Sequence, residues 1–249
     1  DSDFTAVSDK IDIVYEDENI LLVDKPVGMV VHEDESGDSD TLINRIKSYL
    51  YHKGEYRPEN ELSFAPALCN RIDRNTCGIV IAAKNAESLR ILNQKIRDRE
   101  LTKLYLCIAC GKVTPDSATL TAYLEKNSDT NTVKISDKKT KSNLTIKTKY
   151  KVIAYNGENS LLKVDLLTGR THQIRAHLAY IGHALLGDGK YGNNKLNKKY
   201  GFKYQALCSY ELHFKFTTDA GCLSYLDGKC FKAKACLLYT SDAADDLIG

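Results

Sequence analysis

The 249-residue sequence lacks several features that would place it in a common functional class. It has no apolar run long enough to span a bilayer, no apolar N-terminal leader and no low-complexity tract. We identify no phosphate-binding glycine loop, so nothing in the sequence supports the use of ATP or NAD. The G-x-S-x-G turn of serine hydrolases is also missing. We therefore expect a cytoplasmic protein that does not enter a membrane and uses neither ATP nor NAD.

A disulfide framework is also not expected. The chain has eight cysteines but no secretion signal, and cysteines of such proteins usually stay reduced. Cys107 and Cys110 form a C-x-x-C pair, but they lie in an apolar, strand-like run and no second pair follows at zinc spacing. We interpret both as small buried hydrophobic residues.

The two ends of the chain are unusual. The sequence starts at Asp1 without an initiator methionine, which suggests that a segment is missing upstream. Residues 236–249 resemble a translated sequencing adaptor, and we expect them to be a non-native tail. Without the three aspartates of this tail the net charge changes from +2 to +5, which is compatible with an RNA partner but does not demand one.

The stretch Asn70–Gly78 places the carboxylate of Asp73 between Arg71 and Arg74, just before a short apolar run at residues 79–83. The run follows a glycine and is rich in β-branched residues, so we predict a buried strand. At the turn before such a strand, burial favours a neutral carboxyl group, whereas a neighbouring arginine favours the charged form. An ionised carboxylate in a dry pocket can act as a nucleophile or general base. The simpler alternative is an aspartate that caps backbone amides of its turn.

A second stretch of similar character, Leu166–Leu178, has a strand end, a glycine turn and polar residues that open a helix. Together the two stretches resemble the signatures HRLDxxTSG and LxTGRTHQIRxHL of the RluA-type pseudouridine synthases. The second signature is matched almost letter for letter. The first departs at three positions, with Asn70 for His, Ile72 for Leu and Cys77 for Ser.

The resemblance covers about residues 11–235 and implies a mixed α/β (α+β) fold. Its expected centre is a bent, mainly antiparallel sheet flanked by helices, with the site in a central cleft. The resemblance implies that residues 1–10 are a lead-in left after the loss of an S4 RNA-binding module. Residues 11–235 would be the catalytic domain, in which we find no linker.

Local patterns add detail to this fold. Ser39 or Asp40 is expected to cap one helix and Asn85 another. Residues 112–160 are expected to form a β-meander with its lysines pointing outward, and the inward residues would be Ile135, Leu144, Ile146, Val152 and Ile153.

The resemblance also implies the chemistry. A pseudouridine synthase breaks the N1–C1′ bond of a uridine in RNA and rejoins the base through C5. Asp73 would be the nucleophile, attacking either C1′ or C6, and the sequence does not choose between them. Arg175 would keep Asp73 ionised, because arginine stays charged when buried. Tyr105 would stack on a base flipped out of the RNA, although a strand tyrosine is by default a packing residue.

Further residues are expected to contact RNA. Arg71 would fill the gap left by the flipped base, and Ile174 and Leu178 would wall the pocket. The full expected set comprises Arg71, Arg74, Thr76, Arg170, His172, Gln173, Ile174 and Leu178. The RNA would be ribosomal, with 23S rRNA favoured, or transfer RNA, and the protein a monomer.

The sequence allows two rival interpretations. His172, His177 and His183 with Asp188 could bind a metal, but a five-residue spacing puts the first two histidines on different helix faces, so we expect no metal site. The second interpretation is that the protein is a catalytically inactive RNA-binding relative of the same fold. Such a protein would have no need to retain Asp73, Tyr105 and Arg175 together, and their retention argues against it.

Overall fold

The computed structural model describes residues 5–60 and 62–234, so the predicted tail and the first four residues lie outside it. The described chain forms two compact units. Unit 1 contains the residues up to Lys103 and Ser209–Lys234, and unit 2 contains Leu104–Cys208. The chain passes between the units inside two strands, β5 (Leu101–Cys110) and β10 (Leu207–Phe214). Because both boundaries fall inside strands, no linker-like stretch of sequence separates the two units.

The sheet of unit 1 is built around the apolar run after the Asp73 turn. That run forms β4 (Cys77–Ala83), in which every residue is buried, as predicted. Its antiparallel neighbour is β2 (Ile20–Lys25), which pairs with β1 (Asp12–Glu16) on its other side. β10 follows β4 in the sheet, β11 (Cys230–Lys232) pairs with β10, and the short β3 (Ala67–Leu68) pairs with β4.

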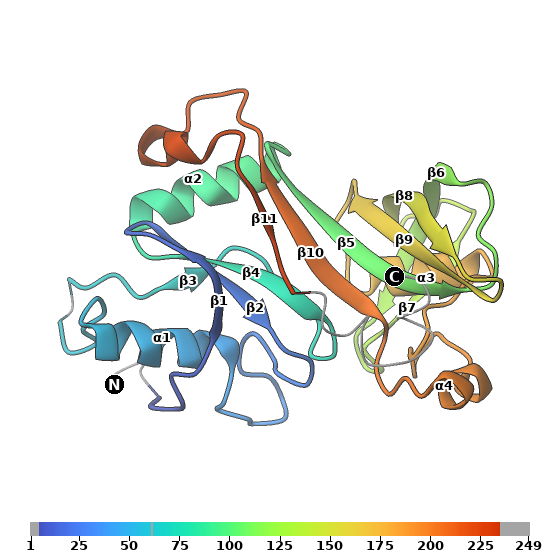
Figure 1. The fold of residues 1–249 in the computed structure, drawn as a ribbon, viewed down its shortest axis with the longest axis horizontal. Coiled ribbons are helices and arrows are strands. Elements are labelled where there is room, and N and C mark those ends of the chain that lie inside the picture. Colours follow the sequence, from blue (N-terminus) through green and yellow to red (C-terminus); the bar gives the residue numbers. More distant parts are fainter. Residues whose placement is uncertain (1–4, 61, 235–249) are drawn as a thin grey trace. The chain divides into compact units, whose positions relative to one another are not determined.

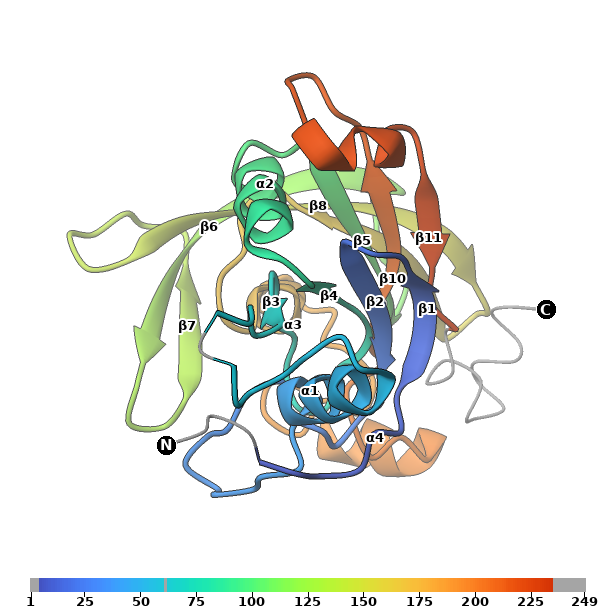
Figure 2. The same cartoon turned by 90° about the vertical axis from the view of Figure 1, so that its left-hand side faces the viewer.

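Helices cover both faces of this sheet, which is why β2 and β4 read as continuous apolar runs (Figure 1, Figure 2). Alternate residues of each strand point to opposite faces. Leu21 and Val23 pack with α1 (Leu42–Lys53), whereas Ile20 and Leu22 pack with α2 (Ala86–Arg97) and the 3₁₀ helix η1 (Gly221–Leu226).

The sheet of unit 2 is antiparallel, in the order β5, β9, β8, β6, β7. One face packs against α3 (Gln173–Tyr180), through contacts such as Ile174 and Leu178 with Val164. A second cluster joins Ala176 of α3 to Ile146. The remaining elements are β6 (Ser117–Asn127), β7 (Thr132–Ser136), β8 (Leu144–Tyr155), β9 (Asn159–Leu166) and α4 (Asn194–Tyr200).

The mixed α/β class and the mainly antiparallel sheet are confirmed. Asn85 caps α2 as predicted, but the cap of α1 is Thr41, whose Oγ1 accepts a hydrogen bond from the backbone N–H of Asn44, and not Ser39 or Asp40. Within the described residues, no helix combines the length and apolarity needed to cross a membrane.

Two residues of the meander were placed wrongly. Leu144 and Ile153 are 47% and 48% exposed, although both were expected to point inward. Leu144 is the first residue of β8, beyond the cluster that buries Ile146. Ile153 lies at a bulge between Val152 and Ala154, which shifts the register of the strand, and it faces away from the core.

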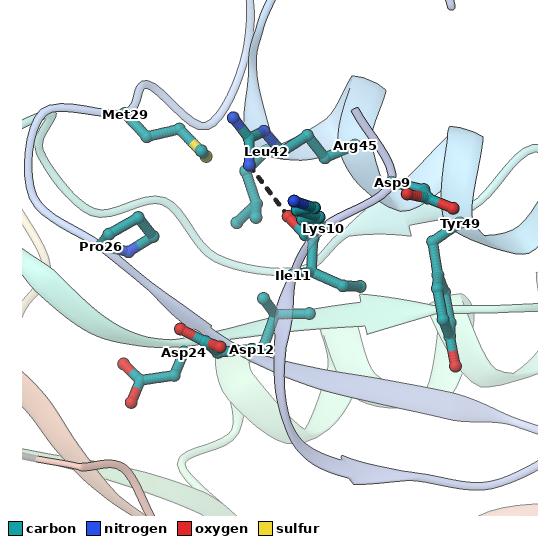
Figure 3. A pocket seen from close by; sticks show the side chains of 11 residues that line it. Asp9, Lys10, Ile11, Asp12, Asp24, Pro26, Met29, Leu42, Arg45 and Tyr49 are labelled. Atoms are coloured by element: carbon teal, nitrogen blue, oxygen red, sulfur yellow. Dashed lines mark hydrogen bonds between the residues drawn. The ribbon is translucent and has the colours of Figure 1, made fainter. Parts of the chain in front are cut away.

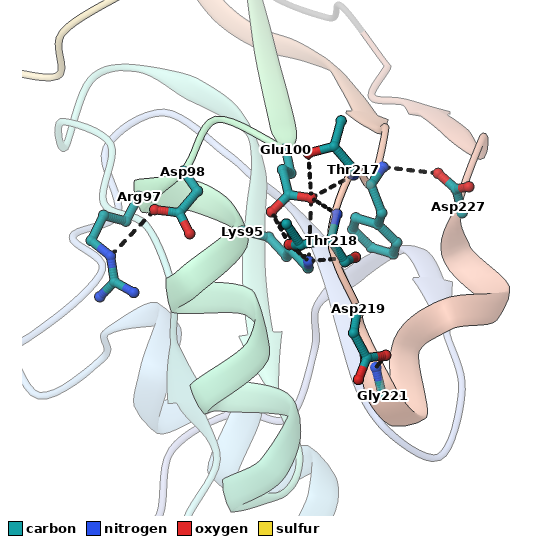
Figure 4. Close-up of polar contacts among 10 residues, drawn as sticks. Lys95, Arg97, Asp98, Glu100, Thr217, Thr218, Asp219, Gly221 and Asp227 are labelled. Carbon is teal, nitrogen blue, oxygen red and sulfur yellow. Dashed lines mark hydrogen bonds and ion pairs between the residues drawn. The ribbon is translucent and has the colours of Figure 1, made fainter.

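A buried ionic network ties α2 to the segment between β10 and η1 (Figure 4). The Nζ of Lys95 lies 3.2 Å from Oε2 of Glu100 and donates to the carbonyl (3.0 Å) and hydroxyl (2.7 Å) oxygens of Thr218. The backbone N–H groups of Thr217 and Thr218 donate to the Glu100 carboxylate. The Thr218 hydroxyl, these N–H groups and Lys95 together lower the pKa of Glu100 to about 2.

We expect Glu100→Gln to lower the melting temperature at pH 7, because the neutral amide cannot accept all these bonds. The pKa is depressed in the folded state, so the ionised carboxylate stabilises the fold above about pH 4.5, and this stabilisation is lost as the pH falls toward 2. The difference in melting temperature, followed by circular dichroism, should therefore shrink in this pH window. Glu59→Gln, at an exposed position, is the control. A difference that stays constant from pH 7 to pH 2 would contradict the assignment.

Candidate functional site

In unit 1 the Asp73 segment forms a tight turn that leads into β4. The backbone N–H of Thr76 donates to the carbonyl of Asp73 at 3.0 Å, and Asp73 is half-buried. Asn70 fixes the start of the segment. Its Oδ1 accepts a hydrogen bond from the N–H of Ile81 at 2.8 Å, and its Nδ2 donates to the carbonyl of Ile79. Asn70, which replaces the histidine of the family signature, thus braces the turn against the following strand.

Gly78 is required by close packing behind this turn. Its φ is +116°, and a Cβ atom at this position would lie 2.1 Å from the carbonyl oxygen of Ser209 in β10. Any other residue would collide with backbone, which cannot move aside as a flexible side chain can. The glycine at the end of the first signature therefore lets β10 approach the strand that begins beside Asp73.

A fully buried lysine, not singled out from the sequence, supports the Asp73 turn. The Nζ of Lys25 donates to three backbone carbonyls: Pro26 (2.7 Å), Met29 (2.7 Å) and Arg74 (2.9 Å). The N–H of Gly28 donates to the same Arg74 carbonyl at 2.8 Å. Lys25 thereby ties the loop after β2 to the residue next to Asp73.

The pKa of Lys25 depends on its burial and on the charge of Asp73 in the turn. Burial lowers its pKa to about 8, while the nearby carboxylate of Asp73 acts in the opposite direction. The signal in the sequence was a lysine directly after an apolar strand and before Pro26, a place where a charged side chain needs buried partners.

The two arginines that flank Asp73 differ in their surroundings. Arg71 is exposed. Arg74 pairs with Asp34 (Nη2–Oδ2 3.2 Å) and donates to the hydroxyl of Ser36 at 3.1 Å. A phosphate group at Arg74 would have to compete with these contacts.

In unit 2 the second signature forms the turn before α3, and Gln173 holds this turn together. Its Oε1 accepts from the hydroxyl of Thr168 and the N–H of Arg170. Its Nε2 donates to the carbonyl of Lys147 and the hydroxyl of Thr148. All four hydrogen-bonding positions of the amide are therefore used within the protein, which leaves none for the predicted contact with RNA.

His172 lies at the start of α3 in the left-handed region, with φ of 54°. Its Nδ1 is 2.7 Å from the hydroxyl of Tyr191, which also accepts the N–H of Val133 at 2.9 Å. The neighbouring Arg170 is exposed, and its side chain is accessible to an anionic ligand.

Arg175 is buried and forms a two-point ion pair with Asp188. Its Nε lies 2.7 Å from Oδ2 and its Nη2 3.1 Å from Oδ1. Burial tends to raise the pKa of Asp188, but Arg175 and the N–H groups of Tyr191 and Lys190 hold it below its usual value. The carboxylate therefore fixes the guanidinium plane, as bidentate pairs do. Asp188 was considered from the sequence only as a metal ligand, so this role was missed.

The sequence does contain a match to the G-x-G-x-x-G pattern, G-D-G-K-Y-G at residues 187–192. A dinucleotide-binding turn would open a helix directly after a strand, whereas this loop lies between α3 and α4 and holds the ion pair of Arg175. A Cβ on Gly187 would lie 1.9 Å from the carbonyl oxygen of Tyr204, so close packing accounts for that glycine.

The residues expected to line a base pocket in unit 2 do come together. Tyr105, Ile174 and Leu178 belong to one buried cluster, in which Tyr105 is 7% exposed. Thr76, from the first signature, is buried in unit 1. Each unit thus carries part of the predicted site, with Asp73 in unit 1 and Tyr105 and Arg175 in unit 2.

The four residues weighed as metal ligands all have protein partners. Nδ1 of His177 contacts the Thr148 hydroxyl, and Nδ1 of His183 contacts the Cys110 carbonyl. Within the described chain, a different trio of ligand types lies within 4.8 Å: Glu211, His213 and Cys230. Nε2 of His213 already lies 2.7 Å from Oε2 of Glu211, so these two side chains are hydrogen-bond partners of each other.

A pocket of about 470 Å³ lies elsewhere in unit 1 (Figure 3). Arg45 crosses it and donates to the carbonyl of Lys10 at 3.0 Å. Burial raises the pKa of Asp24 in its wall. None of the predicted site residues lines this pocket, whose wall comprises residues 9–12 with Val23, Asp24, Pro26, Met29, Leu42, Arg45 and Tyr49.

We expect Lys25→Met to destabilise the protein by about 2–4 kcal/mol, because three carbonyls lose their donor. The urea midpoint should fall without a change in the slope m. Lys215→Met, at an exposed position, removes the same charge and should leave the midpoint within experimental error. Equal midpoints for the two variants would show that Lys25 does not hold the turn.

Asp188→Asn should destabilise the protein by about 3–5 kcal/mol, because the buried Arg175 loses its charged partner. Guanidinium unfolding can be followed by tyrosine fluorescence, since the chain has no tryptophan. The exposed Asp137→Asn serves as the matched control. A stability equal to that of the wild type would mean that the ion pair contributes nothing to folding.

Comparison with known proteins agrees with these motifs. The family described as RNA pseudouridylate synthase matches residues 19–180. An uncharacterized RNA pseudouridine synthase of Mycoplasma genitalium is 39% identical over 216 residues, which cover 84% of this chain and 64% of the relative. The ribosomal large subunit pseudouridine synthase D of Borreliella burgdorferi is 34% identical over 183 residues, 73% of this chain and 55% of that protein. The chain thus spans a little over half to two thirds of the length of these two relatives.

Solved structures show the same fold. The human RNA pseudouridylate synthase domain containing 4 protein has a TM-score of 0.69 at 18% identity, covering 90% of this chain and 88% of that one. The human domain containing 1 protein has a TM-score of 0.66 at 20% identity, covering 97% of both chains. Taken with the two signatures and the family match over residues 19–180, these similarities show that the chain belongs to the RNA pseudouridylate synthase family, as its resemblance to the RluA-type enzymes predicts.

Proposed function

We propose that this protein isomerises uridine to pseudouridine in RNA. The observation that carries the proposal is the retention of Asp73, Tyr105 and Arg175 at matching positions of the family signatures, in a chain that belongs to the family. In the reaction the N1–C1′ bond breaks, the base turns and C5 bonds to C1′. The proton on C5 is lost and N1 gains one, so the product is an isomer and no oxidant or hydrolytic water is consumed.

Asp73 is the proposed nucleophile, at C1′ of the ribose or at C6 of the base. Its place in a tight turn braced by Asn70 and supported by Lys25 favours a single orientation of the carboxylate. Arg175 is assigned to keep Asp73 ionised, and its bidentate contact with Asp188 limits the directions in which its remaining N–H groups can point.

Tyr105 is assigned to stack on the flipped base, with Ile174 and Leu178 beside it. Base stacking on an aromatic ring contributes about 1–3 kcal/mol. Arg71, which is exposed, is placed to fill the space that the base leaves. Arg74, Thr76, Arg170 and His172 are the proposed further contacts with RNA, whereas Gln173 would act by shaping the turn.

Ribosomal RNA is the proposed substrate, with transfer RNA as the alternative. A relative at 34% identity is named for the large ribosomal subunit, which favours the former. We propose that the protein acts in the cytoplasm as a monomer, without metal or cofactor. The competing function is RNA binding without catalysis, which the departures at Asn70 and Cys77 from the family signature leave open.

Release of tritium from RNA labelled at C5 of uridine tests the reaction directly, because bond formation at C5 must expel that hydrogen. The RNA would be transcript from a host that lacks its own RluA-type enzymes. We expect release by the wild type, and a loss of at least roughly a thousandfold in Asp73→Asn, which keeps the shape but not the charge. The exposed Asp129→Asn should retain wild-type activity.

Filter binding of the same RNA separates the two functions. If the wild type binds the RNA but releases no tritium, the catalytic proposal fails and the protein is an RNA-binding relative. If Asp73→Asn releases tritium at the wild-type rate, Asp73 is not the nucleophile.

A further inference from the structure

The outward face of β8 carries three lysines at alternate positions of the strand, Lys147, Lys149 and Lys151, here called the lysine stripe. All three are exposed, whereas the residues that alternate with them, Ile146, Thr148 and Tyr150, are buried. Alternate residues of a strand lie about 7 Å apart, so the stripe presents three positive charges in a row.

The strands beside β8 complete this face. On β6 the residues paired with Lys147, Lys149 and Lys151 are Thr121, Thr119 and Ser117, all exposed hydroxyl residues. On β9, Lys149 faces Asp165 and Lys151 faces Lys163, both half-buried. The face therefore presents ammonium and hydroxyl groups, with one carboxylate at its side.

In the described part of the chain, no ion pair balances the three positive charges of the stripe. Across residues 5–60 and 62–234, no carboxylate lies within ion-pair distance of the Nζ of Lys147, Lys149 or Lys151. Other lysines do have such partners, for example Lys95 with Glu100 and Lys199 with Glu158.

Residues of the second signature hydrogen-bond to the backbone of the stripe at Lys147. The N–H of Lys147 donates to Thr168 Oγ1 at 3.0 Å, and its carbonyl accepts from Gln173 Nε2 at 3.0 Å. The inward residues of β8 contact α3, since Thr148 bonds to His177 and Ile146 packs with Ala176. Within unit 2, the stripe therefore lies on the face of the sheet opposite α3.

We propose that the lysine stripe binds backbone phosphates of the RNA substrate, outside the segment that contains the modified uridine. The proposal rests on RNA being the substrate. Lysine and hydroxyl side chains are the groups that contact phosphates, whereas lysine is depleted in protein–protein interfaces. The β6 residues paired with the stripe are all hydroxyl residues, and the large apolar side chains that β8 exposes, Leu144, Ile153 and Tyr155, lie outside the stripe, toward the two ends of the strand. The stripe itself therefore offers none of the large apolar anchors that a protein partner would use.

The test compares two triple variants that lose the same charge. Lys147→Gln/Lys149→Gln/Lys151→Gln removes the stripe, and Lys195→Gln/Lys198→Gln/Lys203→Gln removes three exposed lysines of the α4 region. Affinity for a long structured transcript is measured over a series of KCl concentrations, after circular dichroism has shown that both variants are folded.

Loss of three phosphate contacts should reduce the slope of log K against log salt by about 2–3. At 0.1 M salt, binding of the transcript should weaken at least about tenfold. The loss should be larger for the long transcript than for a short hairpin confined to the modified loop. The control triple should keep the wild-type slope.

If the slope of log K against log salt is unchanged in the stripe variant, the inference is wrong. It is also wrong if the control variant loses as much RNA affinity as the stripe variant, because the effect would then come from net charge alone. The tritium assay keeps the two proposals apart. If the wild type releases tritium but the slope does not change, only the stripe inference fails. If the wild type releases none and the slope still falls, the stripe binds RNA and the catalytic proposal fails.

Discussion

The Asp73 turn depends on the hydrogen bonds that the buried ammonium group of Lys25 donates to backbone carbonyls. This ammonium group lies with no exposed surface among three backbone carbonyls, two from the loop after β2 and one from Arg74. A buried ammonium is stable only when each of its N–H groups has an acceptor, and three carbonyls match its three donors. This match holds two segments, about fifty residues apart in sequence, in one arrangement. Burial lowers the pKa of Lys25 to about 8.

Some polar residues in and near the second signature stabilise the protein itself, whereas others are accessible to a ligand. Gln173 uses all four of its hydrogen-bonding positions to shape the turn before α3, and Asp188 uses both oxygens on Arg175. Arg170, by contrast, is exposed. Residues of one family motif can therefore have different roles, some structural and some available to a ligand. Only their contacts and exposure in the structure distinguish these roles.

The departures from the first signature are structurally mild. Asn70 retains two hydrogen bonds to the backbone of β4, and Ile72 and Cys77 are buried as apolar residues. None of the three replaces a group assigned to the chemistry. The turn is also held from outside the signature, by Lys25 and by the close approach of β10 to Gly78.

Much of the fold and of the family assignment could be predicted from the sequence. Periodicity identified β4 and the helix that Asn85 caps, because apolar spacing and capping are local properties. The two signatures identified the family, because their residues are close together along the chain. Leu144 and Ile153 were misplaced, because the end of a packed cluster and a bulge depend on neighbouring strands.

The sequence by itself determined the fold class, the family and the residue types available for chemistry. The alternation of Lys147, Lys149 and Lys151 also predicted, correctly, that these lysines point outward. Only the tertiary structure decided that Lys25 supports Asp73 and that Asp188 orients Arg175. The physical reason is that a buried charge takes its partner from whatever group the fold brings within about 3 Å. Its separation from that group along the chain, 49 residues from Lys25 to Arg74 and 13 from Arg175 to Asp188, carries no such information.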